Sequence, residues 1–175
     1  VLFVDRGYWL LQDVLTGEQP EADVEQNFQF EADIKIEFQA GVTVATAPNG
    51  ARLALAPLEG GLSPRLTVGD KEPHVSYWPD GKPKTVLARE DGRDQKHGRG
   101  WTGRSSDKLI PAPAVTYMGK VKLPTAITVA LVPLTPGQAL EQAPQITRAG
   151  DVWTLPTAGG NLRFETTVDS CRVIP

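Results

Sequence analysis

The stretch Val24–Phe38, VEQNFQFEADIKIEF, decides the fold. Its even-numbered residues are apolar apart from Gln26, and its odd-numbered residues, from Glu25 to Glu37, are all polar or charged. A period of two places one kind of side chain on each face of an extended strand. At about 3.3 Å per residue the whole stretch would span roughly 50 Å, which is longer than most strands. We therefore expect two strands that share one inward apolar face, with a bend near Glu31–Asp33.

Short extended segments continue in both directions from this stretch. The run Tyr8–Leu15 is apolar on both faces, which predicts a central strand buried on both sides. Pro48-Asn49-Gly50 separates Val42–Thr46 from Arg52–Leu58 and predicts a β-hairpin. The whole chain contains roughly thirteen such segments and no strong helical pattern. The sequence therefore predicts an all-β fold, a two-layered antiparallel β-sandwich.

The bulk composition limits the class of protein. The chain has 175 residues, of which 40% are hydrophobic and 22% charged, and this suits a single domain over residues 1–175. A net charge of −3 without a basic block argues against nucleic-acid binding. Cys171 is the only cysteine, so no internal disulfide forms, and no apolar run of about 18 residues predicts a membrane span.

The first residues of the sequence predict that it is part of a longer protein. Val1–Val4 reads as sequence from inside a domain and lacks an initiator methionine, so we expect the C-terminal part of a larger chain. The localisation stays open between cytoplasm and periplasm, because a core of this size needs no disulfide cross-links in either compartment.

A long polar loop is expected over residues 70–100, with Thr85–Ala88 as its one strand, and such loops are usually functional or mobile. Aromatic rings can stack on sugar faces, and guanidinium groups can pair with carboxylates or sulfates. The candidate substrate-binding residues in and beside this loop are Tyr77, Trp78, Arg89, Arg93, Arg99, Trp101 and Arg104. Two alternatives stay open: Trp78 and Trp101 plug the edge of the core, and the arginines form a solvated face with the acidic residues between them. By contrast, Tyr8, Trp9 and Trp153 are expected in the core.

No catalytic site is predicted. His74 and His97 lie in the polar loop, and neither has a second ligand at metal-binding spacing. The sequence contains no nucleophile elbow, phosphate-binding loop or zinc-protease motif. We therefore assign no catalytic residue, no metal ligand and no cofactor to this chain.

The order of several motifs resembles the C-terminal β-domain of heparinase II/III-like proteins, a group of bacterial polysaccharide lyases and relatives. The motifs that carry the resemblance are Phe3–Asp13, Gly17-Glu18, Val24–Phe30, Gly100-Trp101, Pro111-Ala112-Pro113 and Leu123-Pro124 with Leu131–Pro133. They cover roughly Val1 to Pro133 and are mainly structural residues. Where relatives often have histidine after the Glu-Gln-x-Phe element this chain has Gln29, and Ser105-Ser106-Asp107 follows its tryptophan loop.

The resemblance implies an antiparallel sandwich that packs beside an N-terminal α/α-toroid. Such parent enzymes are carbon–oxygen lyases that cleave uronic-acid polysaccharides, including glycosaminoglycans, by β-elimination, with asparagine, histidine or a divalent metal neutralising the uronate carboxylate. The catalytic motifs of the family lie upstream of this chain, so we expect the chain alone to be inactive.

Three functions are compatible with the sequence. The first is an accessory β-sandwich domain of such a lyase, with the toroid and an acidic polysaccharide as its partners. The second is an independent carbohydrate-binding module, which predicts exposed rings at Trp78 and Trp101. The third is a purely structural interaction domain, which predicts an apolar patch on its outer surface.

Overall fold

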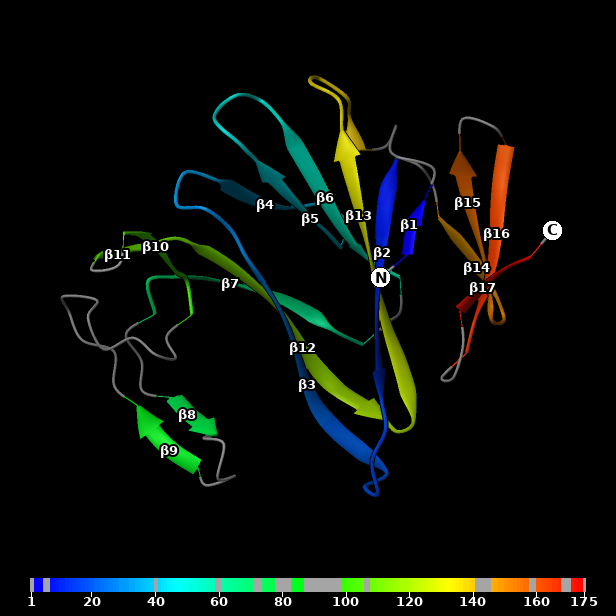
Figure 1. Cartoon of the computed structure of the whole chain (residues 1–175), viewed down its shortest axis with the longest axis horizontal. Helices are drawn as coiled ribbons and strands as arrows, with labels where there is room; N and C mark the ends of the chain where they lie inside the picture. Colours follow the sequence, from blue (N-terminus) through cyan, green and yellow to red (C-terminus); the bar gives the residue numbers. More distant parts are fainter. Residues whose placement is uncertain are drawn as a thin grey trace. The chain divides into compact units, whose positions relative to one another are not determined.

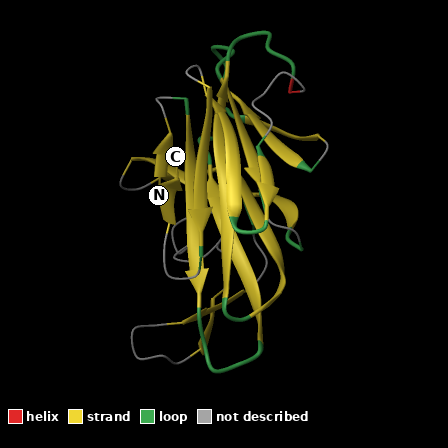
Figure 2. Cartoon of the chain, turned by 90° about the vertical axis from the view of Figure 1, so that its right-hand side faces the viewer, coloured by secondary structure: helices red, strands yellow, loops and turns green. Residues whose placement is uncertain are grey.

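The computed structural model describes residues 2–4, 7–39, 41–58, 61–70, 74–77, 83–86, 99–105, 108–140, 146–157, 160–167 and 171–174. Strands paired in antiparallel sheets make up most of this part of the chain, which contains no α-helix (Figures 1 and 2). The predicted all-β antiparallel sandwich is confirmed. The chain divides into two compact units: unit 1 comprises Val1–Val24, Glu37–Leu62 and Gly119–Pro175, and unit 2 comprises Glu25–Ile36 and Ser63–Met118.

Unit 1 is built on a six-stranded sheet in the order β1-β2-β13-β6-β5-β4 (Figure 1). Its strands are β1 Leu2–Val4, β2 Tyr8–Leu15, β4 Lys35–Gln39, β5 Val42–Thr46, β6 Arg52–Pro57 and β13 Thr125–Leu134. Register places Leu131 of β13 opposite Trp9 on one side and Leu55 on the other. Strands far apart in the sequence therefore lie side by side, and β13 is at the centre of the sheet.

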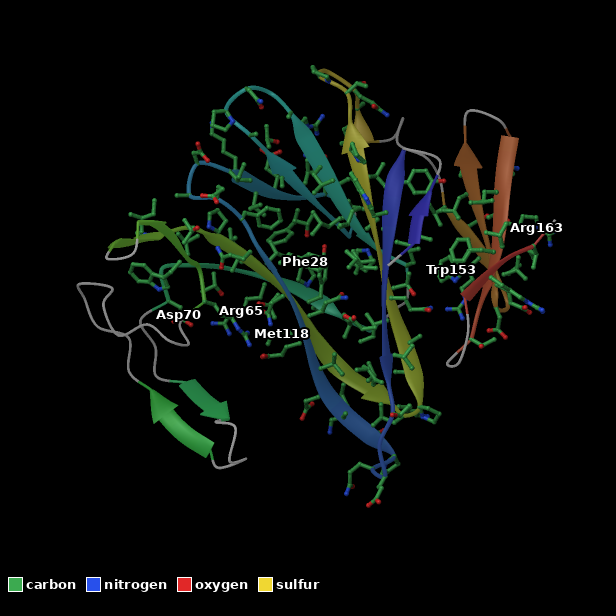
Figure 3. The ribbon with its side chains drawn as sticks, in the orientation of Figure 1. Phe28, Arg65, Asp70, Met118, Trp153 and Arg163 are labelled. Carbon is green, nitrogen blue, oxygen red and sulfur yellow. The ribbon has the colours of Figure 1, made fainter. Side chains whose placement is uncertain are left out.

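A four-stranded sheet in the order β14-β15-β16-β17 forms the second layer of unit 1. Its strands are β14 Thr147–Ala149, β15 Val152–Thr157, β16 Gly160–Thr166 and β17 Cys171–Ile174. Trp153, Leu155 and Phe164 from this sheet join Tyr8, Leu10 and residues of β6 and β13 in one buried cluster. The rings of Trp153 (labelled in Figure 3) and Phe164 stack with centroids 6.2 Å apart. The two sheets thus form the layers of a sandwich.

The core of unit 1 follows from alternation along its strands. Tyr8 and Leu10 are 3% and 2% exposed, and Ala130, the cross-strand neighbour of Leu10, and Val132 are buried in the same cluster as Trp153 and Phe164. Full burial of one large apolar side chain contributes about 1.5–3 kcal/mol. The Tyr8 hydroxyl donates a hydrogen bond to the Pro156 carbonyl at 2.9 Å, which links the two layers.

Unit 2 contains the three-stranded sheet β3-β12-β7, in which β3 is Glu21–Gln29, β7 is Ser63–Val68 and β12 is Pro113–Lys122. Two hairpins accompany it: β8 His74–Tyr77 with β9 Pro83–Val86, and β10 Trp101–Ser105 with β11 Lys108–Pro111. Val115 and Tyr117 of β12 are fully buried, and the Phe28 ring (labelled in Figure 3) meets the Tyr117 ring edge-on at 5.9 Å. Strands β3 and β12 each run from one unit into the other.

The stretch Val24–Phe38 does break into two strands with a turn at residues 32–33, and the burial of β3 alternates with a period of two. The two strands belong to different sheets, however, and Phe38 is 45% exposed because β4 is a terminal strand. The Pro48-Asn49-Gly50 hairpin is confirmed, with Gly50 at a φ of 83°.

Two predictions about strands were wrong. Strand β2 is not buried on both faces, since Trp9 is 38% and Val14 46% exposed. Tyr8 and Leu10 are the residues of this strand that belong to the buried cluster. The predicted loop 70–100 contains a two-stranded hairpin, so Thr85–Ala88 is not its one strand and His74–Tyr77 was missed. Four residues between prolines and charged groups carry too short a pattern to reveal a strand without its partner.

Candidate functional site

Arg99 and Trp101, the candidate residues whose side chains are described, lie at the end of the segment 70–100 and the start of β10. Asp70 N–H donates to the Arg99 carbonyl at 3.0 Å, and Gly69 N–H donates to the Gly100 carbonyl at 2.7 Å. The Gly100 carbonyl also accepts from Ala112 N–H at 2.8 Å. These bonds tie the end of β7 to the start of β10 and to the segment before β12.

Gly100 is required at this junction. Its φ is +77°, and a Cβ there would lie 2.7 Å from Gly69 N, 2.8 Å from the Thr67 carbonyl oxygen and 2.9 Å from Val68 Cα. All three are backbone atoms, which cannot move aside as a flexible side chain could. Only glycine combines this positive φ with such a close approach of backbones.

Trp101 is held by the same junction. Its indole N–H donates to the Asp70 carbonyl at 3.0 Å, and one ring carbon would be 3.5 Å from a Cβ placed on Gly69. The side chain is half-buried. Packing of this kind agrees with the alternative in which Trp101 plugs the edge of the core, and it leaves part of the ring accessible.

Arg99 pairs with a carboxylate of the stretch Val24–Phe38. Its guanidinium donates to Glu25 and forms an ion pair with it, and both side chains are partly exposed. The hydrogen bond from Arg99 lowers the pKa of the Glu25 carboxyl, partial burial opposes this shift, and the charges of Arg99 and Arg65 lower the pKa further. Two arginines therefore act on one carboxylate, and an acidic ligand would compete with Glu25 for Arg99.

The other candidate residues cannot be placed with their side chains. Trp78, Arg89 and Arg93 lie outside the described residues. Tyr77 pairs with Pro83 in the β8–β9 hairpin, and Arg104 lies in β10, but only their backbones are described. The structure brings Arg99 and Trp101 together, and it leaves the rest of the predicted binding surface a prediction.

An apolar surface that the sequence analysis missed lies on the face of β2 opposite the sandwich core. Its centre is Trp9, which was expected in the core and is 38% exposed. Register places Leu131 beside Trp9 on one side and beside the fully buried Leu55 on the other, and it places Pro133 beside Leu53 two residues further along. Leu131 and Leu53 are half-buried, and Pro133 is exposed. We call Trp9, Leu131, Leu53 and Pro133 the Trp9 surface.

Alternation alone indicates which face Trp9 occupies, because Tyr8 and Leu10 take the opposite one. Sequence cannot reveal whether a second layer covers that face, since coverage depends on residues far away in the chain. An aromatic residue in an apolar run therefore reads as core until the packing is known.

The described residues contain no group of three or more histidine, cysteine, aspartate or glutamate side chains that could hold a metal ion. None of the described segments is a helix long and apolar enough to cross a membrane.

A scan against protein-family models, a search of curated proteins and a search of solved structures each found no match to this chain.

Proposed function

We propose that this chain is an accessory β-sandwich domain that docks against the catalytic α/α-toroid of a heparinase II/III-like polysaccharide lyase and does not itself catalyse. The observation that carries the docking role is the Trp9 surface, in which an exposed tryptophan lies beside Leu131 on a sheet face that is fully buried further along, at Leu55 and Val129. The family assignment depends on the quoted motifs alone, because the comparisons add no relative.

The Trp9 surface has the chemistry of a docking site. Tryptophan contributes a large apolar area and is enriched among the residues that dominate binding energy. Exposed apolar groups clustered on a sheet are typical of surfaces that another protein covers. In the proposed assembly the toroid supplies the base and acid for β-elimination, and this domain supplies support and one wall for the polysaccharide.

The first test is the intact mass of the native gene product, compared with 18.9 kDa for this chain. A much heavier product with a large helical N-terminal portion supports the proposal. That whole protein is then assayed on polyuronates for the ultraviolet absorbance of unsaturated ends. A native product no larger than this chain would refute the lyase assignment.

The second test separates docking from folding in the whole protein. Trp9→Arg is compared with Val14→Arg, a matched control on the opposite face of the same strand with 46% exposure. We expect Trp9→Arg to weaken association of the two domains at least about 10-fold and to lower lyase activity, with little effect from the control. Equal effects of the two variants would contradict docking through the Trp9 surface. Association with a partner other than a lyase toroid would favour the structural interaction domain.

A carbohydrate-binding module is the second candidate, and the group formed by Arg65, Arg99 and the half-buried Trp101 favours it. Two cations around the single Glu25 carboxylate leave a net positive charge for an acidic glycan. Titration of the chain with a polyuronate should then show saturable binding that Arg65→Gln weakens without changing the melting temperature. Absence of binding at millimolar sugar would exclude this candidate.

A further inference from the structure

The outer edge of β7 is the side of this strand that faces away from β12. β7 is the terminal strand of its sheet, and among the described strands none pairs with its outer side. Leu66 and Val68 of this strand are 40% and 53% exposed, although Val115 of β12, the partner of Leu66, is fully buried. An edge of this kind presents unpaired backbone groups and a ready template for a further strand.

The register identifies which backbone groups point outward. The Pro113 carbonyl accepts the Phe30 N–H at 2.9 Å, so the backbone of Pro113 faces β3. Val68 is the β7 residue opposite Pro113, and the two therefore form a non-hydrogen-bonded pair. It follows that Val68, Leu66 and Pro64 direct their backbone groups to the open edge. Pro64 has no N–H, so only Leu66 and Val68 offer both a donor and an acceptor there.

We propose that β7 pairs with β7 of a second copy of this chain, antiparallel about a two-fold axis at Thr67. Leu66 of each copy then lies opposite Val68 of the other, and each pair exchanges both N–H···O bonds. The same patch meets itself, as a two-fold interface requires. This inference does not depend on the proposed function.

The charge of Arg65 selects this register. Pairing Leu66 with Leu66 would set Pro64, which has no N–H, opposite Val68, and would give the same number of backbone bonds as the register centred on Thr67. It would leave the two Arg65 side chains only two residues apart along the strands, however, and like charges across strands are destabilising. The register centred on Thr67 separates them by four residues, roughly 13 Å at about 3.3 Å each.

The apolar side chains agree with the same arrangement. Because cross-strand partners share a face, Leu66 lies on the face of Val115, and Pro64 lies on the face of Tyr117. In the dimer, Leu66 and Val68 of both copies would form one continuous row that extends this face. A contact through one short strand buries little area, so a weak dimer is expected.

Sedimentation velocity and amide hydrogen exchange on the full chain test the dimer directly. Between about 1 µM and about 1 mM we expect a concentration-dependent dimer, as a weak interface requires. The Leu66 and Val68 amides should exchange slowly at high concentration and fast when dilute. The Arg65 and Thr67 amides, which face β12, should stay protected at both. A monomer throughout the range, or a dimer without protection of Leu66 and Val68, would overturn the proposal.

Leu66→Pro removes an outward N–H and keeps the bonds to β12, and we expect it to weaken the dimer at least about 10-fold. Val68→Lys provides a second variant in case the proline impairs folding, and should weaken the dimer through charge repulsion. Val14→Lys is the control, because Val14 is similarly exposed but lies away from β7, on β2 opposite Ala126 of β13. Dimers unaffected by both β7 variants, or instead disrupted by the control, would refute pairing through β7.

Discussion

At the scale of single residues, backbone geometry at Gly100 and one ion pair explain how Arg99-Gly100 is held beside Gly69-Asp70, at the two ends of the segment 70–100. Gly100 accepts two backbone hydrogen bonds with its carbonyl, and Arg99 beside it forms an ion pair with Glu25 of β3. One residue therefore permits the close approach, and its neighbour adds a charge contact across unit 2.

Gly100→Ala should destabilise the fold by about 3–5 kcal/mol, because its Cβ would overlap three backbone atoms as well as occupy a left-handed conformation. Gly50→Ala is the matched control: its φ is +83°, but a Cβ there meets nothing within 4 Å. We expect the control to cost only about 1–2 kcal/mol. Urea unfolding of both variants measures the difference, and equal losses would contradict the packing described for Gly100.

The ion pair predicts a small dependence of stability on pH. The pKa of Glu25 is lower in the folded state than its ordinary value of 4.5, so its ionised form favours folding. This contribution is complete above about pH 4.5 and is lost as the pH falls through the folded-state pKa. Because the pair is partly exposed, it is worth less than about 1 kcal/mol. Glu25→Gln should therefore be less stable than the native chain at pH 7 and equally stable in strong acid, as urea titrations at several pH values would measure. A difference that persists in acid would indicate another cause.

At the scale of elements, the hydroxyl of Tyr8 joins β2 to β15 across the sandwich of unit 1. Tyr8→Phe keeps the buried ring and removes only the donor to Pro156, so we expect a loss of about 1 kcal/mol. Tyr8→Ala also empties the space beside Leu10 and Trp153 and should cost about 3–5 kcal/mol. Thermal unfolding compares the two, and a phenylalanine variant as damaging as the alanine variant would show that the ring contributes little.

At the scale of the whole molecule, β3 and β12 each contribute residues to both compact units. Loss of either unit would fray a strand on which the other depends, so we expect one cooperative unfolding transition. Leu155→Ala in unit 1 and Val115→Ala in unit 2 should each lower the temperature of that same transition, since both side chains are fully buried. Scanning calorimetry measures this, and two peaks that the variants shift separately would contradict it.

The sequence by itself determined the all-β class, the turn after β3 and the Pro48-Asn49-Gly50 hairpin. These features depend on alternation and turn chemistry, which act between residues close together in the chain. The burial of Tyr8 and Trp153 was predicted correctly because each is an aromatic residue in a strand-like run, but the same reasoning was wrong for Trp9.

Only the tertiary structure decided which faces are covered and which strand edges are open. Trp9 and Tyr8 are neighbours in one apolar run, yet a second sheet covers Tyr8 and leaves Trp9 exposed. Leu66 and Val68 look like ordinary strand residues until β7 is found at the end of its sheet. The partnership of Arg99 with Glu25 joins residues 74 positions apart. Coverage, edges and long-range pairs depend on how distant segments meet, and no local pattern carries that information.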